Sequence, residues 1–360
     1  MLQLKNANII SLESYDKIFK DTDLIIKDKK VYDISKKEYN CKCIDLNKDI
    51  ILPGFIDNHF HSMDLFLNGH LENKTLHETT HSELWRWLQE NITGDESYIS
   101  SLKAYYDSLN GGVTFIHDFS YYKENHGLIK AFKESQLNGL IALQDIDMIK
   151  KKVRKFDFDK KLNYSILIPE EDHLDNSYFE FVKNFINKDI ITTMHIAETK
   201  FRVNSIDFNI INYLNKYGII DNSTFVPTHG IYLKNRDLDR IVPTIKSEYK
   251  LDDGKFDFNK FELVGLGTDG PFWSDGNIID EMKFRKKEYD LESYEILRQA
   301  TYNNAKILGL EDDIGTISEG KYADFLVIDK KVIEGSNDIY GNIIENINPD
   351  LIKDVYIKGK

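Results

Sequence analysis

Short apolar segments typical of β-strands recur along the middle of this 360-residue chain, and helical patterns lie between most of them. Strand, helix and strand in succession form the repeating unit of a parallel sheet covered by helices. Eight such segments predict an α/β protein with a (β/α)8, or TIM, barrel. The segments are residues 54–57, 113–119, 140–146, 164–169, 192–197, 224–230, 241–245 and 263–269.

The clearest helical patterns occur at residues 178–188 and 208–218. In both, apolar residues recur at i, i+3, i+4 and i+7, which is the spacing of one helix face. Gly218 follows the second pattern and predicts a C′ cap. The segment between the last two strands, "KSEYKLDDGKFDFNKFE", is polar and only weakly helical.

Both ends of the chain contain strand-like segments without helix-length patterns. Residues 1–50 hold several short β segments, and "KDKK" between two of them is typical of a hairpin turn. The C-terminal "KYADFLVID" and "DVYIKGK" are also strand-like. We therefore expect one small β-module built from residues 1–50 and 316–360, flanking a barrel of residues 51–315.

The charge of the chain limits its partners. The formal net charge is −13, from 47 basic and 60 acidic residues. Such a chain has no basic excess to neutralise phosphates, which argues against nucleic-acid and anionic-membrane partners. The expected partner is a small molecule, and a homo-oligomer is left open.

The sequence also predicts a cytoplasmic, reducing location. The N-terminus has no apolar segment of signal-peptide length, and no run of 18 apolar residues occurs. The only cysteines are Cys41 and Cys43, in "CKCIDL". They supply half of a zinc site at most, so a structural role is favoured.

Two histidines stand at the end of the first strand, in "LPGFIDNHFHS". Residues i and i+2 of an extended chain project to the same side, so His59 and His61 can hold one metal ion. The alternative, which the motif alone favours, is a pair of surface histidines in a turn. Functional side chains gather at the carboxyl ends of barrel strands, so the metal site stays a candidate beside it.

Further candidates follow later strands. His195 and Glu198 end the fifth strand in "TMHIAET", and Asp269 ends the eighth in "GLGTDG". Alone, the first is typical of a core histidine and the last of a turn. Together, His59, His61, His195 and Asp269 offer three nitrogens and one oxygen to Zn²⁺ or Fe²⁺.

These motifs resemble a known family. "LPGFIDNHFHS", "HIAET", "THG", "LGTDG" and "NNAKILGLEDDIGTISEGKYADFLVID" are similar to motifs of the amidohydrolase superfamily. Within it, the chain is similar to the branch that holds cytosine, guanine and adenosine-type deaminases and triazine chlorohydrolases. The resemblance runs from about residue 20 to the end, and it implies a (β/α)8 barrel, a terminal β-sandwich and one catalytic metal.

The resemblance also implies roles for individual residues. His59, His61 and His195 match the histidine ligands, Glu198 the proton-shuttling glutamate, His229 the strand-six histidine that contacts the reacting group, and Asp269 the strand-eight aspartate. Binuclear relatives often have a bridging lysine after strand four, where "SILIPEED" has none. This favours one metal, with Glu170 left open as a bridge to a second.

Positions that face substrate in the family differ here. A histidine–proline turn after strand four is replaced by "IPEEDHLD", where His173 partly stands in. A Ser–Asn pair after strand seven is replaced by "VPTIKSE", where Lys246 takes the place of a neutral amide. His117 and Trp273 are further candidates for substrate contact. The aromatic residues after strands two and eight could stack on a planar heterocycle, with core packing as the alternative. They are Tyr121, Tyr122, Phe272 and Trp273.

The segment after the first strand carries His70, His77 and His81. It is a candidate lid, with a solvated loop as the alternative. Trp85 and Trp87 lie two positions apart in a predicted helix, so at most one faces the core.

The predicted function is a metal-dependent hydrolase acting on non-peptide carbon–nitrogen bonds, by deamination of a nucleobase-like or nucleoside-like heterocycle. Glu198 would protonate the ring nitrogen, Asp269 would take a proton from water and His229 would polarise the oxyanion. The alternatives are an amide or halide leaving group on a similar ring, or a non-catalytic barrel that serves as a binding module.

Overall fold

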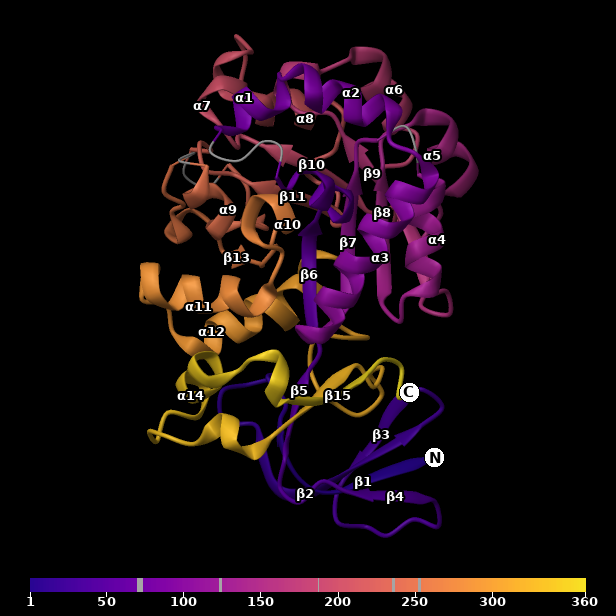
Figure 1. The fold of residues 1–360 in the computed structure, drawn as a ribbon, viewed down its shortest axis with the longest axis vertical. Coiled ribbons are helices and arrows are strands. Elements are labelled where there is room, and N and C mark those ends of the chain that lie inside the picture. Colours follow the sequence, from indigo (N-terminus) through magenta and orange to yellow (C-terminus); the bar gives the residue numbers. More distant parts are fainter. Residues whose placement is uncertain (70–73, 123–124, 187, 235–236, 252–253) are drawn as a thin grey trace. The chain divides into compact units, whose positions relative to one another are not determined.

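The computed structural model describes residues 1–69, 74–122, 125–186, 188–234, 237–251 and 254–360 (Figure 1). The chain forms two compact units. The first comprises Met1–Ile56, Asp107–Phe115 and Ile278–Lys360, and the second comprises Asp57–Tyr106 and Ile116–Asn277.

The main sheet has six strands in the order β11-β10-β9-β8-β7-β6. The pairs β8–β9, β9–β10 and β10–β11 are parallel, as the predicted strand–helix alternation requires. The strands are β6 (Phe55–Phe60), β7 (Val113–Ser120), β8 (Asn138–Leu143), β9 (Leu162–Ile168), β10 (Thr192–Ile196) and β11 (Phe225–His229). The confirmed fold is therefore an α/β fold with a nearly closed parallel barrel.

A short parallel pair, β12 (Arg240–Ile241) and β13 (Leu263–Val264), stands where the last two predicted strands lie. Single parallel bridges join Thr228 to Val242 and Phe60 to Asp269. Both strands are shorter than predicted for a physical reason. Pro243 follows β12 and has no N–H to donate to a ladder. Gly267 follows β13, and a Cβ there would lie 2.5 Å from the Cβ of His59, so the backbone approaches β6 closely.

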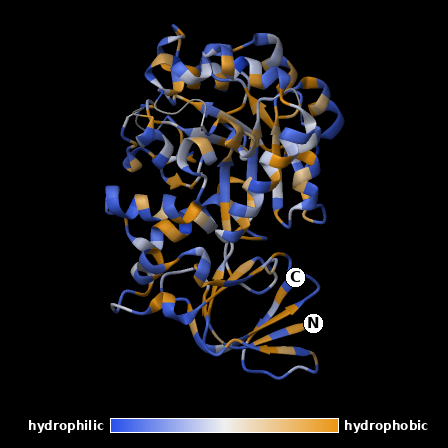
Figure 2. Cartoon of the chain, viewed as in Figure 1, coloured by the Kyte–Doolittle hydropathy of each residue, from blue (hydrophilic) through white to orange (hydrophobic). Residues whose placement is uncertain are grey.

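Burial explains why these segments form the sheet. Every residue of β6, β7, β8, β10 and β11 is buried, as expected for parallel strands covered on both faces. Figure 2 shows helices with both hydrophobic and hydrophilic residues, the pattern of a helix with one face against a sheet. The helices of the second unit are α1 (Leu76–Thr80), α2 (Glu83–Asn91), α4 (His126–Glu134), α5 (Ile146–Lys152), α6 (Asn176–Val182), α7 (Lys200–Asn204), α8 (Ile210–Lys216), α9 (Ile245–Lys250) and α10 (Pro271–Ser274).

The predicted helices at 178–188 and 208–218 exist as α6 and α8, both shorter than expected. Gly218 lies just beyond the α8 C-cap with φ +71°, the left-handed conformation predicted for it. Trp85 on α2 is 6% exposed and Trp87 is 57% exposed, so one of the two faces the core, as predicted.

Strands from both ends of the chain form one seven-stranded sheet in the first unit, in the order β15-β14-β5-β1-β2-β3 with β4 beside β1. A two-sheet sandwich is not confirmed. The "KDKK" turn is confirmed, because β2 and β3 pair antiparallel and Asp28 and Lys29 both have positive φ, as in a type I′ hairpin. The strands are β1 (Leu2–Ile10), β2 (Ile18–Lys27), β3 (Lys30–Ile34), β4 (Lys42–Asp45), β5 (Ile50–Pro53), β14 (Phe325–Ile328) and β15 (Ile352–Tyr356).

The other helices are α11 (Ile278–Tyr289), α12 (Ser293–Arg298), α13 (Asn304–Ile307) and α14 (Ile339–Asn346), and α3 (Gly94–Asn110) runs from the second unit into the first. Within the described residues, every helix is too short or too polar to pass through a bilayer.

Candidate metal centre and active site

Three histidines from distant parts of the sequence meet at the carboxyl end of the barrel strands. His59 lies on β6, His61 directly follows β6, and His195 lies on β10. One ring nitrogen of each lies within 4.8 Å of the others. His61 Nε2 and His195 Nε2 are 3.3 Å apart. The i, i+2 spacing thus brings two imidazoles to one point, and β10 supplies the third.

The surroundings of these histidines favour a metal ligand over a core residue. Neither ring nitrogen of His59 has a hydrogen-bond partner among the described residues, although its side chain is fully buried. Buried polar atoms normally have a partner, so these nitrogens indicate a missing ligand. His61 Nδ1 lies 3.2 Å from the Phe119 carbonyl oxygen. If the Nδ1–H donates a hydrogen bond to that oxygen, the lone pair of Nε2 is available to bind a metal.

Burial also keeps these rings neutral, which is the form that binds metal. Loss of solvation, with the neighbouring His59, lowers the pKa of His61 to about 3. Burial and the surrounding histidines hold the pKa values of His59 and His195 well below the usual range. The three nitrogens therefore fit a divalent ion such as zinc without having to lose a proton.

Asp269 approaches the same point from the segment after β13. Its Oδ1 lies 3.5 Å from His59 Nε2 and 3.4 Å from His61 Nε2. Its Oδ2 accepts a hydrogen bond from Ser247 Oγ at 2.6 Å. One carboxylate oxygen is thus fixed by the protein, and the other faces the histidines.

His229 and Glu198 form a second pair beside the histidine group. His229 Nε2 lies 3.6 Å from Glu198 Oε1, and its Nδ1 lies 3.2 Å from Thr244 Oγ1. Burial disfavours the charged ring, but Glu198, Glu248 and Asp269 together raise the pKa of His229 to about 9. At neutral pH this ring is a cation, unlike the three neutral histidines.

The backbone at these strand ends is strained. Ala197, His229 and Asp269 have φ values of +48°, +65° and +70°, a region that residues other than glycine rarely adopt. Such conformations cost about 1–3 kcal/mol each and cluster at functional sites. Ala197 directly follows β10, His229 ends β11, and Asp269 forms a bridge to Phe60 of β6.

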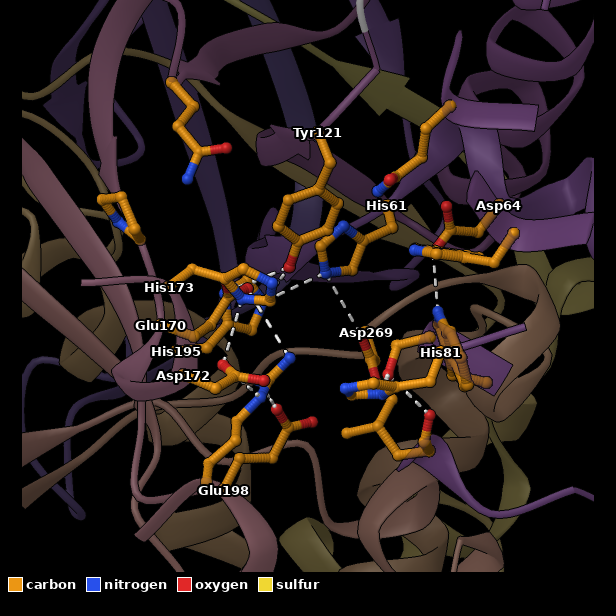
Figure 3. Close-up of a pocket in the computed structure, with 18 of the residues that line it drawn as sticks. His61, Asp64, His81, Tyr121, Glu170, Asp172, His173, His195, Glu198 and Asp269 are labelled. Atoms are coloured by element: carbon orange, nitrogen blue, oxygen red, sulfur yellow. Dashed lines mark hydrogen bonds and ion pairs between the residues drawn. The ribbon is translucent and has the colours of Figure 1, made fainter. Parts of the chain in front are cut away.

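His61, His195, Glu198 and Asp269 line a cavity of about 600 Å³ within the second unit (Figure 3). Trp273 lines this cavity, and its Nε1 donates to Asp64 Oδ2 at 2.6 Å. His173 also lines it, but its side chain is 67% exposed and its Nδ1 lies 3.1 Å from Asp172 Oδ1. Both residues are therefore placed where a substrate contact is feasible.

His117 is placed differently from our expectation. It is fully buried and does not line the cavity. Its Nδ1 lies 3.2 Å from Asn58 Oδ1 and its Nε2 lies 2.7 Å from Ser165 Oγ. Both nitrogens have partners inside the barrel, so this geometry favours the core alternative over substrate contact.

Lys246, expected after strand seven as a replacement for a substrate-facing amide, pairs with Asp275 at 3.0 Å and does not line the cavity. In the candidate lid, His81 lines the cavity while His77 does not. His70 lies outside the described residues.

Several cavity or support residues were not singled out from the sequence. Thr244 and Ser247 are 3.0 Å apart and link His229 to Asp269 through side-chain oxygens. Arg202 follows Glu198 at i, i+4 spacing, and this spacing could have predicted their ion pair from the sequence. Tyr121 was singled out as an aromatic residue, but the sequence does not reveal that its hydroxyl lies 2.7 Å from His195 Nε2.

Solved structures share this fold. An adenosine deaminase from Xanthomonas campestris with bound zinc aligns with a TM-score of 0.84 and 17% identity, over all of this chain and 92% of that one. An atrazine chlorohydrolase variant from Arthrobacter aurescens, complexed with zinc and atraton, aligns with a TM-score of 0.86 and 17% identity, over all of this chain and 94% of that one.

Similar sequences cover nearly the whole chain. A 5-methylthioadenosine/S-adenosylhomocysteine deaminase from Clostridium tetani is 25% identical, over 99% of this chain and 92% of the relative. The family model described as "Amidohydrolase family" matches residues 50–360. The chain therefore belongs to the amidohydrolase family.

Proposed function

We propose that the protein is a metal-dependent aminohydrolase that removes ammonia from a nitrogen heterocycle of the adenosine or nucleobase type. As a member of its family, it is a hydrolase of carbon–nitrogen bonds. The observation that supports the proposal most is the cluster of three histidines with Asp269 beside them, next to the His229–Glu198 pair, at one cavity that His61, His195, Glu198 and Asp269 line. The names of the relatives support an adenosine-type substrate.

The proposed ligands of the metal are His59, His61, His195 and Asp269. A divalent ion held there would supply Lewis acidity and lower the pKa of bound water to about 7. We infer zinc, because the ligand set suits it and two neighbours of the same fold contain it. Ferrous iron is the second candidate for the same ligands.

The carboxylates would move the protons. Asp269 Oδ1, which faces the histidines, is placed to accept the proton of the attacking water. Burial raises the pKa of Glu198, and this carboxyl group would deliver a proton to the ring nitrogen beside the attacked carbon. The proton taken up by Asp269, or one from Glu198, would then pass to the amino group, and the carbon–nitrogen bond of the tetrahedral intermediate would break with loss of ammonia.

His229 would stabilise the developing oxyanion. Its pKa of about 9 makes the ring a cation at neutral pH, and it lies next to Glu198. A fixed positive charge at the point where negative charge develops lowers the activation barrier.

The proposal also covers the strand number of the barrel, the domain boundaries, the cellular location and the oligomeric state. We infer that β12 and β13 complete an eight-stranded barrel of residues 51–315, with residues 1–50 and 316–360 as the composite β-module. A cytoplasmic location and a homo-oligomer are compatible with the proposal and form part of it.

An ammonia-release screen tests the proposed function. The zinc-loaded and iron-loaded proteins would be incubated with adenosine, 5′-substituted adenosines, adenine, guanine and cytosine, and Glu198→Gln protein would serve as the matched blank. Ammonia from at least one compound, absent with the variant, is the expected result. Release of halide or a carboxylic acid from similar rings, without ammonia, would favour the other leaving groups. Metal content without turnover of any compound would favour a binding module.

A further inference from the structure

Arg202 is a buried cation at the cavity that the proposed reaction does not use. It is 9% exposed and lines the cavity. Its guanidinium contacts three carboxylates, with NH1 bonded to Glu198 Oε2, NH2 3.8 Å from Glu170 Oε1 and Nε 3.7 Å from Asp172 Oδ1. Figure 3 shows these three acidic side chains gathered on one side of the cavity.

Local sequence brings Arg202 to this point. Helix α7 begins directly after the β10 segment, and its N-cap Thr199 accepts a hydrogen bond from the Arg202 N–H at 3.1 Å. This tight turn places Arg202 one helical turn after Glu198, so the two side chains meet. The segment after β9 supplies the other two carboxylates.

The two oxygens of Glu198 have different neighbours. Oε2 is bonded to Arg202, and Oε1 lies 3.6 Å from His229 Nε2. A guanidinium has a rigid, planar set of donors, and it stays charged when buried. Arg202 therefore fixes one oxygen of Glu198 and leaves the other facing His229.

We propose that Arg202 is the positioning residue that holds Glu198 for proton transfer. The inference rests on the proposed function, because Glu198 is assumed to carry the proton. Since Arg202 acts through Glu198, its removal should reduce turnover more than substrate binding.

A second buried Glu–Arg pair provides a matched control. Arg285 Nε donates to Glu281 Oε1 at 2.9 Å, also with i, i+4 spacing, and Arg285 is fully buried. Arg285 NH1 donates to Gln299 Oε1 at 2.7 Å, and neither Arg285 nor Glu281 lines the cavity. Loss of this pair should lower stability without a specific effect on chemistry.

The experiment is a double-mutant cycle on the metal-loaded full chain. Wild type, R202M, R202K, E198Q and E198Q/R202M would be compared in kcat, KM, metal content and thermal midpoint, with R285M as the control. We expect R202M to lower kcat at least about 10²-fold, the usual contribution of a positioned proton-transfer group, with KM changed less than about threefold. R202K should recover part of the loss. In the E198Q background, R202M should cause no further loss of kcat.

Three results would overturn the proposal. They are an equal further loss of kcat in the E198Q background, a rise in KM with kcat unchanged, and a loss in R202M that R285M matches in both activity and thermal midpoint. If R202M does not fold, the same comparison is made with R202K, which keeps the charge but not the planar donors. A crystal structure of the variant should show the Glu198 side chain displaced, and an unmoved Glu198 would contradict the role. Inactive wild type would instead reject the proposed function.

Discussion

His59 and His117 lie on the neighbouring strands β6 and β7, and both are completely buried. Burial lowers the pKa of both rings, in His117 to about 3. Yet His117 has a polar partner at each nitrogen, whereas neither nitrogen of His59 has a hydrogen-bond partner in the part of the chain that the structure describes. The comparison shows that burial alone does not distinguish a core histidine from a metal ligand. The two differ in whether the ring nitrogens have hydrogen-bond partners.

The largest expected effect is the loss of turnover when His59, the histidine without hydrogen-bond partners among the described residues, is replaced. His59→Ala should abolish measurable ammonia release, because the metal loses one of its ligands. His117→Asn, the matched change at the satisfied histidine, should keep most of the activity. Steady-state assays with metal supplied in excess would make the comparison, and equal losses in both variants would remove the distinction between the two histidines.

A smaller loss of turnover is expected at the proton-transfer position. Glu198→Gln keeps the shape of the side chain but removes the exchangeable proton, so kcat should fall about 10²–10⁴-fold. Metal content should remain that of wild type, since Glu198 is not a proposed ligand. Full activity in this variant would show that another group moves the proton.

Replacing His117, the histidine with a hydrogen-bond partner at each nitrogen, should lower the free energy of unfolding. His117→Phe leaves Asn58 Oδ1 and Ser165 Oγ without their partner, and each unsatisfied buried group costs about 1–3 kcal/mol. Urea unfolding of the metal-free proteins would measure the difference. A change below about 0.5 kcal/mol would indicate that water replaces the imidazole.

The same ring should also contribute to the pH dependence of stability. Its folded pKa of about 3 lies below the ordinary value of 6.5, so between these pH values the unfolded chain binds more protons. Stability should therefore rise with pH across this window, by up to about 1.4 kcal/mol per pH unit from this one group. Unfolding of wild type and His117→Phe at several pH values should show a smaller slope in the variant, and parallel slopes would contradict the assignment.

The smallest expected effect concerns substrate contact. Trp273→Phe keeps the aromatic surface but removes the hydrogen bond from Nε1 to Asp64. We expect KM to rise several-fold, in line with one hydrogen bond of about 0.5–1.5 kcal/mol, with kcat nearly unchanged. An unaltered KM would place Trp273 among the packing residues.

Much of this picture was predictable from the sequence, for physical reasons. Strand–helix alternation determines a parallel sheet, and parallel strands bring their carboxyl ends together, so His59, His61 and His195 were expected to converge. The length of β12 and β13 was not predictable, because the close approach of Gly267 to His59 depends on the folded structure.

The support of the site was harder to foresee. The link from Asp269 through Ser247 and Thr244 to His229 joins residues whose roles appear only in three dimensions. His117 has the same strand-end setting as His195, and only the identity of its neighbours distinguishes the two.

The most direct test of the central claim is the metal stoichiometry of the purified protein. Elemental analysis after zinc loading and removal of excess metal should give about one zinc per chain in wild type and in His117→Asn, and close to none in His59→Ala. Wild-type protein without bound metal, or equal zinc in all three proteins, would contradict the metal centre on which the account depends.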